Sequence, residues 1–342
     1  MSNGLVIKST GSSYLVWFED ETTLECHVKG NFRIRGIRST NPVAVGDRVA
    51  VETLPDGTNW ITEIADRKNY IIRRATNLSK ESHILAANLD RVAIVVTLYH
   101  PVTSTTFIDR FLATAEAYRV PAVLVFNKID LLTPEQQDEL AAIRALYESL
   151  GYPTYAISAL NLKSNSASGP TSNSVSGLTG EAGPFQGVTL LAGNSGVGKS
   201  TLLNALFGCE KTRTGQISDA HDKGMHTTTF SEMYQLPLTA QRSNSGSGPT
   251  AQRSNSGSGL TSWIIDTPGI KGFGAVQMEK EEISHYFREI FAIGRNCRYG
   301  NCLHTGDAGC AVYDAVVDGR IAVSRYESYV SLLGDCTESK YR

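Results

Sequence analysis

The stretch GNSGVGKST, residues 193–201, has the residue types and spacing needed to hold phosphate. Glycines in the pattern G-x-x-x-x-G-K-[ST] let backbone N–H groups converge on phosphate oxygens; here Lys199 would reach the terminal phosphates as a catalytic group, and the Ser200 hydroxyl would ligate Mg²⁺. The apolar run VTLLA before the stretch and the helix-like STLLNALFG after it are the flanks that such a loop requires. We expect nucleotide contacts from Gly193, Asn194, Ser195, Gly196, Val197, Gly198, Lys199, Ser200 and Thr201.

The phosphate loop does not distinguish ATP from GTP, but the tetrapeptide NKID does. Asp130 can accept hydrogen bonds from the guanine ring N–H and the exocyclic amine, a donor pair that adenine lacks. Asn127 and the stem of Lys128 would brace the base and the loop, and a backbone N–H of Ser158 or Ala159 would meet the guanine carbonyl. The alternative, a turn that only leads into a helix, is less favoured because NKID ends a buried strand-like run.

Two further stretches supply groups for the γ-phosphate side of the nucleotide. In IIDTPG, Asp266 would act on magnesium through a bound water, and the Gly269 N–H would sense the γ-phosphate. In HTTT, Thr228 is expected to ligate Mg²⁺, with Thr227 as the alternative.

The position after DTPG bears on how GTP would be hydrolysed. Many small GTPases place a glutamine there to orient the attacking water, but here it is Ile270, which cannot do so. His226, beside the switch threonines, is therefore the candidate catalytic group. The alternative is a histidine that only caps the switch segment.

A cysteine and histidine cluster follows the pattern C-x4-C-x-H-x5-C. Three thiolates and one imidazole complete a tetrahedral zinc site with no open position, so the role would be structural. The alternative is an incidental or redox cluster. The predicted ligands are Cys297, Cys302, His304 and Cys310, whereas Cys26, Cys209 and Cys336 are expected to be small, mostly buried residues.

Residues 1–68 read as short strands separated by turns, which predicts a small β-barrel, and the OB-fold is the commonest such barrel that handles nucleic acid. A basic stretch around one aromatic could hold phosphates and stack a base. A solvated basic strand edge explains the same residues equally well. The RNA-binding candidates are Lys29, Phe32, Arg33, Arg35 and Arg38.

Strand and helix patterns alternate over residues 69–277, which predicts a doubly wound α/β domain. Two polar segments within it, 164–183 and 239–262, are rich in Ser, Gly and Asn, and the second holds a tandem repeat of TAQRSNSGSG; both are expected to be flexible. Residues 278–342 are expected to form a helical domain around the zinc cluster, beginning with a helix over 279–294.

The composition, with 41% hydrophobic and 19% charged residues, is that of an ordinary globular protein. No apolar run approaches the ~20 residues of a membrane helix, and no signal peptide is expected, so we expect a cytoplasmic protein without a membrane partner. The net charge of −2 limits any nucleic-acid surface to a local patch.

The motifs occur in an unusual order, because NKID precedes the phosphate loop. Together with VGDRV in the barrel, HTTT, DTPGI, the cysteine cluster and RYESY near the end, they resemble the RsgA (YjeQ) family of circularly permuted GTPases. The resemblance covers nearly the whole chain. It implies a permuted P-loop GTPase domain with an N-terminal OB-fold barrel and a C-terminal zinc-binding helical domain.

The resemblance also implies that the protein binds the 30S ribosomal subunit and its 16S rRNA, hydrolyses GTP with Mg²⁺ under stimulation by that subunit, and acts in late subunit maturation. We expect it to be a monomer. One departure from the family pattern is the pair of Ser/Gly/Asn-rich segments. A nucleotide-gated RNA-binding module with incidental hydrolysis is the alternative function. A small-molecule kinase or ATPase is disfavoured by NKID.

Overall fold

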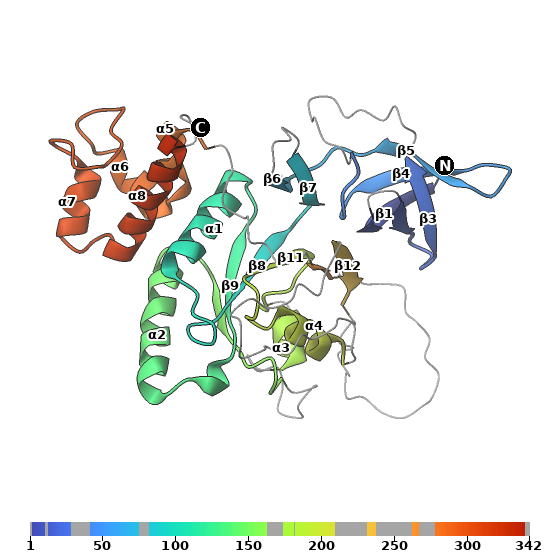
Figure 1. The fold of residues 1–342 in the computed structure, drawn as a ribbon, viewed down its shortest axis with the longest axis horizontal. Helices are drawn as coiled ribbons and strands as arrows, with labels where there is room; N and C mark the ends of the chain where they lie inside the picture. Colours follow the sequence, from blue (N-terminus) through green and yellow to red (C-terminus); the bar gives the residue numbers. More distant parts are fainter. Residues whose placement is uncertain are drawn as a thin grey trace, which may run out of the picture.

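The structure is a computed structural model, and it describes residues 2–10, 13–28, 42–74, 82–162, 174–180, 182–208, 231–236, 262–266 and 278–338. A β-barrel, an α/β domain and a helical C-terminal part follow one another along the chain (Figure 1). Within these residues no helix is both long and apolar enough to cross a bilayer.

The N-terminal barrel consists of β1 (Ser2–Ser9), β2 (Tyr14–Trp17), β3 (Thr23–Val28), β4 (Arg48–Thr53) and β5 (Asn59–Ile64). The strands pair in the order β1-β2-β3-β5-β4, and β4 pairs back onto β1 to close the barrel. Alternate residues such as Val6, Val16 and Ile61 point inward and are fully buried. The predicted OB-like barrel is therefore confirmed, with β1 as a strand that the sequence analysis did not single out.

A hairpin of β6 (Tyr70–Arg74) and β7 (Ser82–Ala87) leads into the α/β domain. Its sheet has the order β10-β9-β8-β11-β13-β12, in which only β12 runs antiparallel. The strands β8 and β9 are buried throughout or nearly so, as their continuous apolar sequences predict. The strand bounds are β8 (Arg91–Val96), β9 (Ala122–Phe126), β10 (Thr154–Ala156), β11 (Val188–Ala192), β12 (Glu232–Gln235) and β13 (Trp263–Asp266).

Helices cover both faces of this sheet (Figure 1). On one face α1 (Thr105–Ala117) and α2 (Pro134–Ser149) share a core with β8 and β9. On the other, α3 (Val175–Thr179) and α4 (Lys199–Phe207) bury Leu178 and Leu202. The predicted start of α2 is confirmed by a capping box between Thr133 and Gln136.

The strand order confirms a circular permutation. Starting at β11 and reading β12, β13, β8, β9 and β10 gives the conventional motif order, with the phosphate loop first and the base-reading motifs last. The carboxyl ends of the parallel strands meet at one edge of the sheet, which is where open α/β sheets bind ligands. The permutation therefore changes the chain ends and keeps the nucleotide-binding edge.

The barrel and the α/β sheet form one continuous sheet through β1 and β12. Lys8 lies opposite Glu232 in this pairing, and their side chains form an ion pair of 3.2 Å. Beside it the rings of Trp17 and Trp263 meet edge to face, with centroids 5.2 Å apart.

The C-terminal module, residues 278–338, has its own core, to which Phe287, Ile290 and Tyr329 contribute. Its elements are α5 (Lys280–Ile283), the 3-10 helix η2 (Ser284–Tyr286), α6 (Arg288–Gly294), α7 (Ala311–Val317) and α8 (Val323–Glu338). The single helix expected over 279–294 is wrong, because the backbone leaves the helical region at Phe287. There the ring packs edge to face against Tyr329, at 5.5 Å, and beneath the Arg325 guanidinium.

The expected flexible segment 164–183 also needs a correction. Residues 175–179 form α3, with Ser174 as its N-cap, and Leu178 is fully buried in the core beneath it. The earlier part of that segment, and all of 239–262 except residue 262, lie outside the described residues.

Candidate active site and metal cluster

The phosphate loop follows β11 directly and ends at α4, whose N-cap Gly198 has a φ of 95°. Two glycines are required by space as well as by φ. A Cβ on Gly193 would lie 2.2 Å from the Val95 carbonyl oxygen, and one on Gly198 would lie 2.4 Å from Nδ2 of Asn127. The backbone can adopt this loop only with glycine at these positions.

Lys199 is held inside the loop. Its Nζ donates to the carbonyl oxygens of Gly193 at 2.7 Å and Asn194 at 2.8 Å. Burial lowers the pKa of Lys199, and the nearby Asp266 carboxylate opposes that shift. An ammonium has three protons, so one remains for a phosphate oxygen.

The base-reading motif is tied to the phosphate loop by Asn127. This side chain is 4% exposed; its Nδ2 donates to the Val197 carbonyl at 2.8 Å, and its Oδ1 accepts from the Ala159 N–H at 2.9 Å. One amide thus fixes three loops that follow β9, β10 and β11. Lys128 adds a second tie, because its Nζ donates to the Gly196 carbonyl at 2.7 Å.

The remaining base-reading candidates lie beside this tie. Asp130 is exposed within the 3-10 helix η1 (Ile129–Leu131), with its carboxylate accessible to a ligand. Ser158 is buried two residues after the end of β10, and the Ile157 N–H between them donates to the Phe126 carbonyl at 2.8 Å. The structure therefore brings Asn127, Lys128, Asp130 and Ser158–Ala159 to one edge of the sheet.

Two of the three candidate magnesium ligands are described. Ser200 is the second residue of α4, and Asp266 is buried at the end of β13, opposite Leu191 in the neighbouring strand. A hydroxyl and a carboxylate are ligands that suit Mg²⁺. The predicted residues His226, Thr227, Thr228, Gly269 and Ile270, and the RNA-binding candidates Lys29, Phe32, Arg33, Arg35 and Arg38, lie outside the described residues.

The four predicted zinc ligands come together in the C-terminal module, with ligand atoms all within 4.8 Å of one another. His304 Nδ1 lies 3.4 Å from the Cys297 sulfur and 3.7 Å from the Cys310 sulfur. Ordinary Zn–S and Zn–N bond lengths in a tetrahedron place such atoms ~3.6 Å apart. Burial raises the pKa of the Cys302 thiol to about 12, so a cation is needed to hold it as a thiolate. The donor set therefore fits zinc in both geometry and chemistry.

The loop that carries these ligands is fastened by α8. The hydroxyl of Tyr326 donates to the His304 carbonyl, and that of Tyr329 donates to the Leu303 carbonyl, both at 2.8 Å. Sequence reasoning did not assign these two tyrosines a role. Their i, i+3 spacing on one helix face was the signal that could have linked them.

Comparison with known proteins supports the interpretation of this site as that of a GTPase. The RsgA GTPase profile matches residues 64–242, the RsgA N-terminal domain profile residues 3–61, and the profile of 50S ribosome-binding GTPases residues 188–299. The small ribosomal subunit biogenesis GTPase RsgA of Phocaeicola vulgatus is 53% identical over 339 residues, which cover 99% of this chain and 98% of that protein. The protein of that name from Bacteroides fragilis is 53% identical over 340 residues, with the same coverage.

Solved structures show the same architecture. The crystal structure of YjeQ from Thermotoga maritima has a TM-score of 0.68 and 28% identity and covers 98% of both chains. YloQ, described as a circularly permuted GTPase, has a TM-score of 0.66 and 24% identity over 100% of this chain and 97% of its own, and supports the fold alone. The chain belongs to the RsgA GTPase family and is a GTP hydrolase.

Proposed function

We propose that this GTPase binds the 30S ribosomal subunit and acts in its late maturation, with GTP hydrolysis stimulated by the subunit. The observation that carries the proposal is the 53% identity, over 99% of the chain, to proteins named small ribosomal subunit biogenesis GTPases. The N-terminal barrel, joined to the α/β sheet through β1 and β12, supports it, since small barrels of the OB type bind oligonucleotides. A role in ribosome assembly would place the protein in the cytoplasm. We propose that it acts there as a monomer.

The described residues suggest how the nucleotide is held. Asp130 would read the guanine donors, a backbone N–H of the Ser158–Ala159 loop would meet the guanine carbonyl, and the phosphate-loop N–H groups and Lys199 would hold the phosphates. Ser200 and Asp266, with Thr228, would hold Mg²⁺, which neutralises charge between the β- and γ-phosphates. His226 would orient the attacking water, since Ile270 cannot.

We further propose that Cys297, Cys302, His304 and Cys310 hold one structural Zn²⁺. Metal analysis of purified, unchelated protein should give one zinc per chain. Replacing Cys310 by Ser should lower that value and expose the α8 tyrosines to solvent, which is visible as a change in tyrosine fluorescence. A full-length protein with far less than one zinc per chain would refute the site.

The barrel is proposed to contact 16S rRNA through Lys29, Phe32, Arg33, Arg35 and Arg38. Reversing the charge of Arg33, Arg35 and Arg38 should weaken 30S binding and flatten its dependence on salt. An affinity for 30S that ignores these changes would leave the barrel patch as a solvated strand edge.

One assay decides the main proposal. GTP turnover is measured alone, with 30S subunits, and with equal amounts of 50S subunits as the control. We expect strong stimulation by 30S only, as external activators produce in other slow GTPases. Binding to 30S without a change in turnover would favour the alternative, a nucleotide-gated RNA-binding module with incidental hydrolysis.

A further inference from the structure

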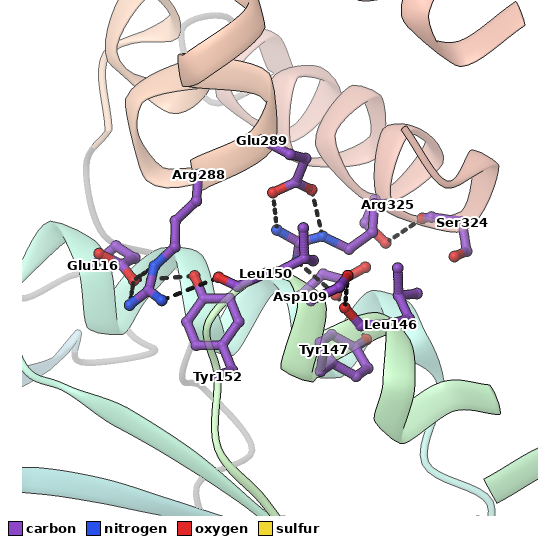
Figure 2. Close-up of polar contacts among 12 residues, drawn as sticks. Asp109, Glu116, Leu146, Tyr147, Leu150, Tyr152, Arg288, Glu289, Ser324 and Arg325 are labelled. Carbon is purple, nitrogen blue, oxygen red and sulfur yellow. Dashed lines mark hydrogen bonds and ion pairs between the residues drawn. The ribbon is translucent and has the colours of Figure 1, made fainter. Parts of the chain in front are cut away.

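Arg288, the first residue of α6, reaches from the C-terminal module to the α/β domain (Figure 2). Its Nε donates to Oε1 of Glu116 on α1 at 2.7 Å. Its Nη1 donates to the carbonyl oxygens of Leu150 at 3.1 Å and Gly151 at 2.9 Å, just after α2. The guanidinium also lies 4.0 Å over the Tyr152 ring. One side chain thus contacts every residue of the turn 150–152.

This turn is built tightly around the arginine. Gly151 has a φ of 81°, and a Cβ there would come within 2.9 Å of Nη1 of Arg288. Tyr152 is 1% exposed, and its hydroxyl donates to the same Glu116 oxygen at 3.0 Å. The position of the turn therefore depends on Arg288 as well as on the α/β domain itself.

The turn leads directly into β10, and the loop Ser158–Ala159 follows that strand at its other end. Within the described sheet β10 is an edge strand of three residues that pairs with β9 alone. A strand this short has few ladder hydrogen bonds to fix it. Side chains add to these: Thr154 accepts from Arg144 and donates to Glu148 of α2, and Tyr155 donates to the Ala182 carbonyl. Arg288 supplies a further tie, at the turn before the strand.

We propose that Arg288 is a positioning residue for guanine recognition, acting from the C-terminal module through the 150–152 turn and β10. The inference rests on the proposed reading of guanine by Asp130 and the Ser158–Ala159 loop. Because the arginine and the loop lie at opposite ends of β10, its effect is on where the loop sits and not on contact with the base.

The module does not need Arg288 in order to stay docked. Arg325 pairs with Asp109 at 2.8 Å, and Arg110 pairs with Asp335 at 2.6 Å. Ala113 of α1 is 1% exposed and belongs to the core of the module. Arg288, whose side chain is 40% exposed, can therefore be replaced with the interface kept.

The test compares Arg288→Met and Arg288→Lys with wild type and with Arg295→Met. The control removes an exposed arginine of the same module that stacks on Phe291, 4.7 Å from the ring centroid. Dissociation constants for GDP and inosine diphosphate are measured by competition with a fluorescent guanine nucleotide. Both bases carry the carbonyl that the Ser158–Ala159 loop would meet, but only guanine has the exocyclic amine that Asp130 would read.

We expect Arg288→Met to weaken both nucleotides by the same factor, about three- to tenfold, as when one neutral hydrogen bond is weakened. The ratio of the two affinities should not change, because Asp130 sets it. Arg288→Lys should recover part of the loss, and the Arg295 variant should match wild type. Equal GDP affinity in wild type and Arg288→Met would overturn the inference.

Hydrogen exchange separates positioning from undocking. In Arg288→Met, exchange should rise over residues 152–161 and stay unchanged over 193–207 and 323–338. A matching rise over 323–338 would mean that the module has come loose, which contradicts a positioning role. If wild-type protein itself shows no preference for GDP over inosine diphosphate, the proposed guanine reading fails, and this inference fails with it.

Discussion

The stability of the docked C-terminal module should depend on one buried arginine. Arg325 on α8 donates from Nη1 to Oδ1 of Asp109 at 2.8 Å, and from Nε and Nη2 to Glu289 at 2.7 and 3.1 Å (Figure 2). Its side chain is 1% exposed, and that of Asp109 is fully buried. Tyr147 donates to the same Asp109 oxygen at 2.8 Å. The Arg325 guanidinium thus pairs with the Asp109 carboxylate of α1 and with the Glu289 carboxylate of its own module.

Replacing Arg325 by Met keeps an unbranched side chain of moderate size and removes the charge. Asp109 is then left buried with no cation, a situation that costs about 3–5 kcal/mol of unfolding free energy. A domain is stable by only about 5–15 kcal/mol, so the loss is large. The matched control is Arg320→Met, since Arg320 pairs with Asp318 on the surface, where both side chains are more than half exposed. Such a pair contributes about 0–1 kcal/mol.

The sign of the pH dependence follows from Asp109. Burial raises the pKa of Asp109, and the charge of Arg325 opposes that rise. A carboxylic acid whose pKa is higher in the folded state than in the unfolded state lowers the free energy of unfolding at pH values where it is ionised. This destabilisation disappears as the pH falls through the folded-state pKa toward the unfolded value of about 3.9. Without Arg325 the pKa of Asp109 should rise further. The loss of unfolding free energy in Arg325→Met, relative to wild type, should therefore be largest near pH 8 and smaller near pH 5.

Urea unfolding followed by far-ultraviolet circular dichroism, at both pH values, measures this directly. Combining Arg325→Met with Asp109→Asn should cost less than the sum of the two single changes, because no charge then remains at position 109. A deficit below about 1 kcal/mol, as an exposed pair would give, would refute the reasoning. So would a deficit that grows as the pH falls.

Three further results are expected at the nucleotide site. Asp130→Asn should weaken GTP and favour xanthosine triphosphate in competition binding, and an unchanged preference for GTP would contradict the base assignment. Gly198→Ala should lower nucleotide affinity more than tenfold in calorimetric titration, because its Cβ would meet Nδ2 of Asn127 at 2.4 Å; Gly334→Ala, in open space on α8, should leave affinity unchanged. His226→Ala should reduce GTP turnover without weakening GTP binding, and unchanged turnover would remove His226 from the mechanism.

The positions of the described candidate nucleotide-site residues, at the ends of buried strands, were predictable because the signals for them are local. The apolar runs of β8, β9 and β11, and the glycines whose φ values the phosphate loop needs, are each contained in a few neighbouring residues. The zinc cluster was predictable for the same reason, since its ligands lie within fourteen residues of one another. When cysteine and histidine residues lie this close together in the sequence, the chain between them is too short to hold their side chains far apart.

Features set by distant contacts were not predictable in this way. The break at Phe287 depends on Tyr329 and Arg325, which come about forty residues later in the chain. Asp109 is a buried acidic residue of α1, and its partners, Tyr147 of α2 and Arg325 of the docked module, come much later in the chain. Val175 and Leu178 are the only large apolar residues of the Ser/Gly/Asn-rich sequence 164–183, so composition alone predicted no core there.

The permutation gives the C-terminal module an unusual place relative to the nucleotide. The chain leaves the sheet after β13, on the side proposed to hold the γ-phosphate, and reaches Met278 through residues 267–277. The module then packs on α1, the helix that leads into β9 (Figure 1), and its Arg288 binds the turn between α2 and β10 (Figure 2). The module is thus joined by the chain itself to β13. Arg288 and Arg325 join it to the helices and the turn that flank β9 and β10. If β13 and these flanking elements shift relative to each other when GTP becomes GDP, the module must follow one attachment and strain the other. A two-ended attachment of this kind would let a distant module respond to the bound nucleotide, provided that its contacts differ between the two states.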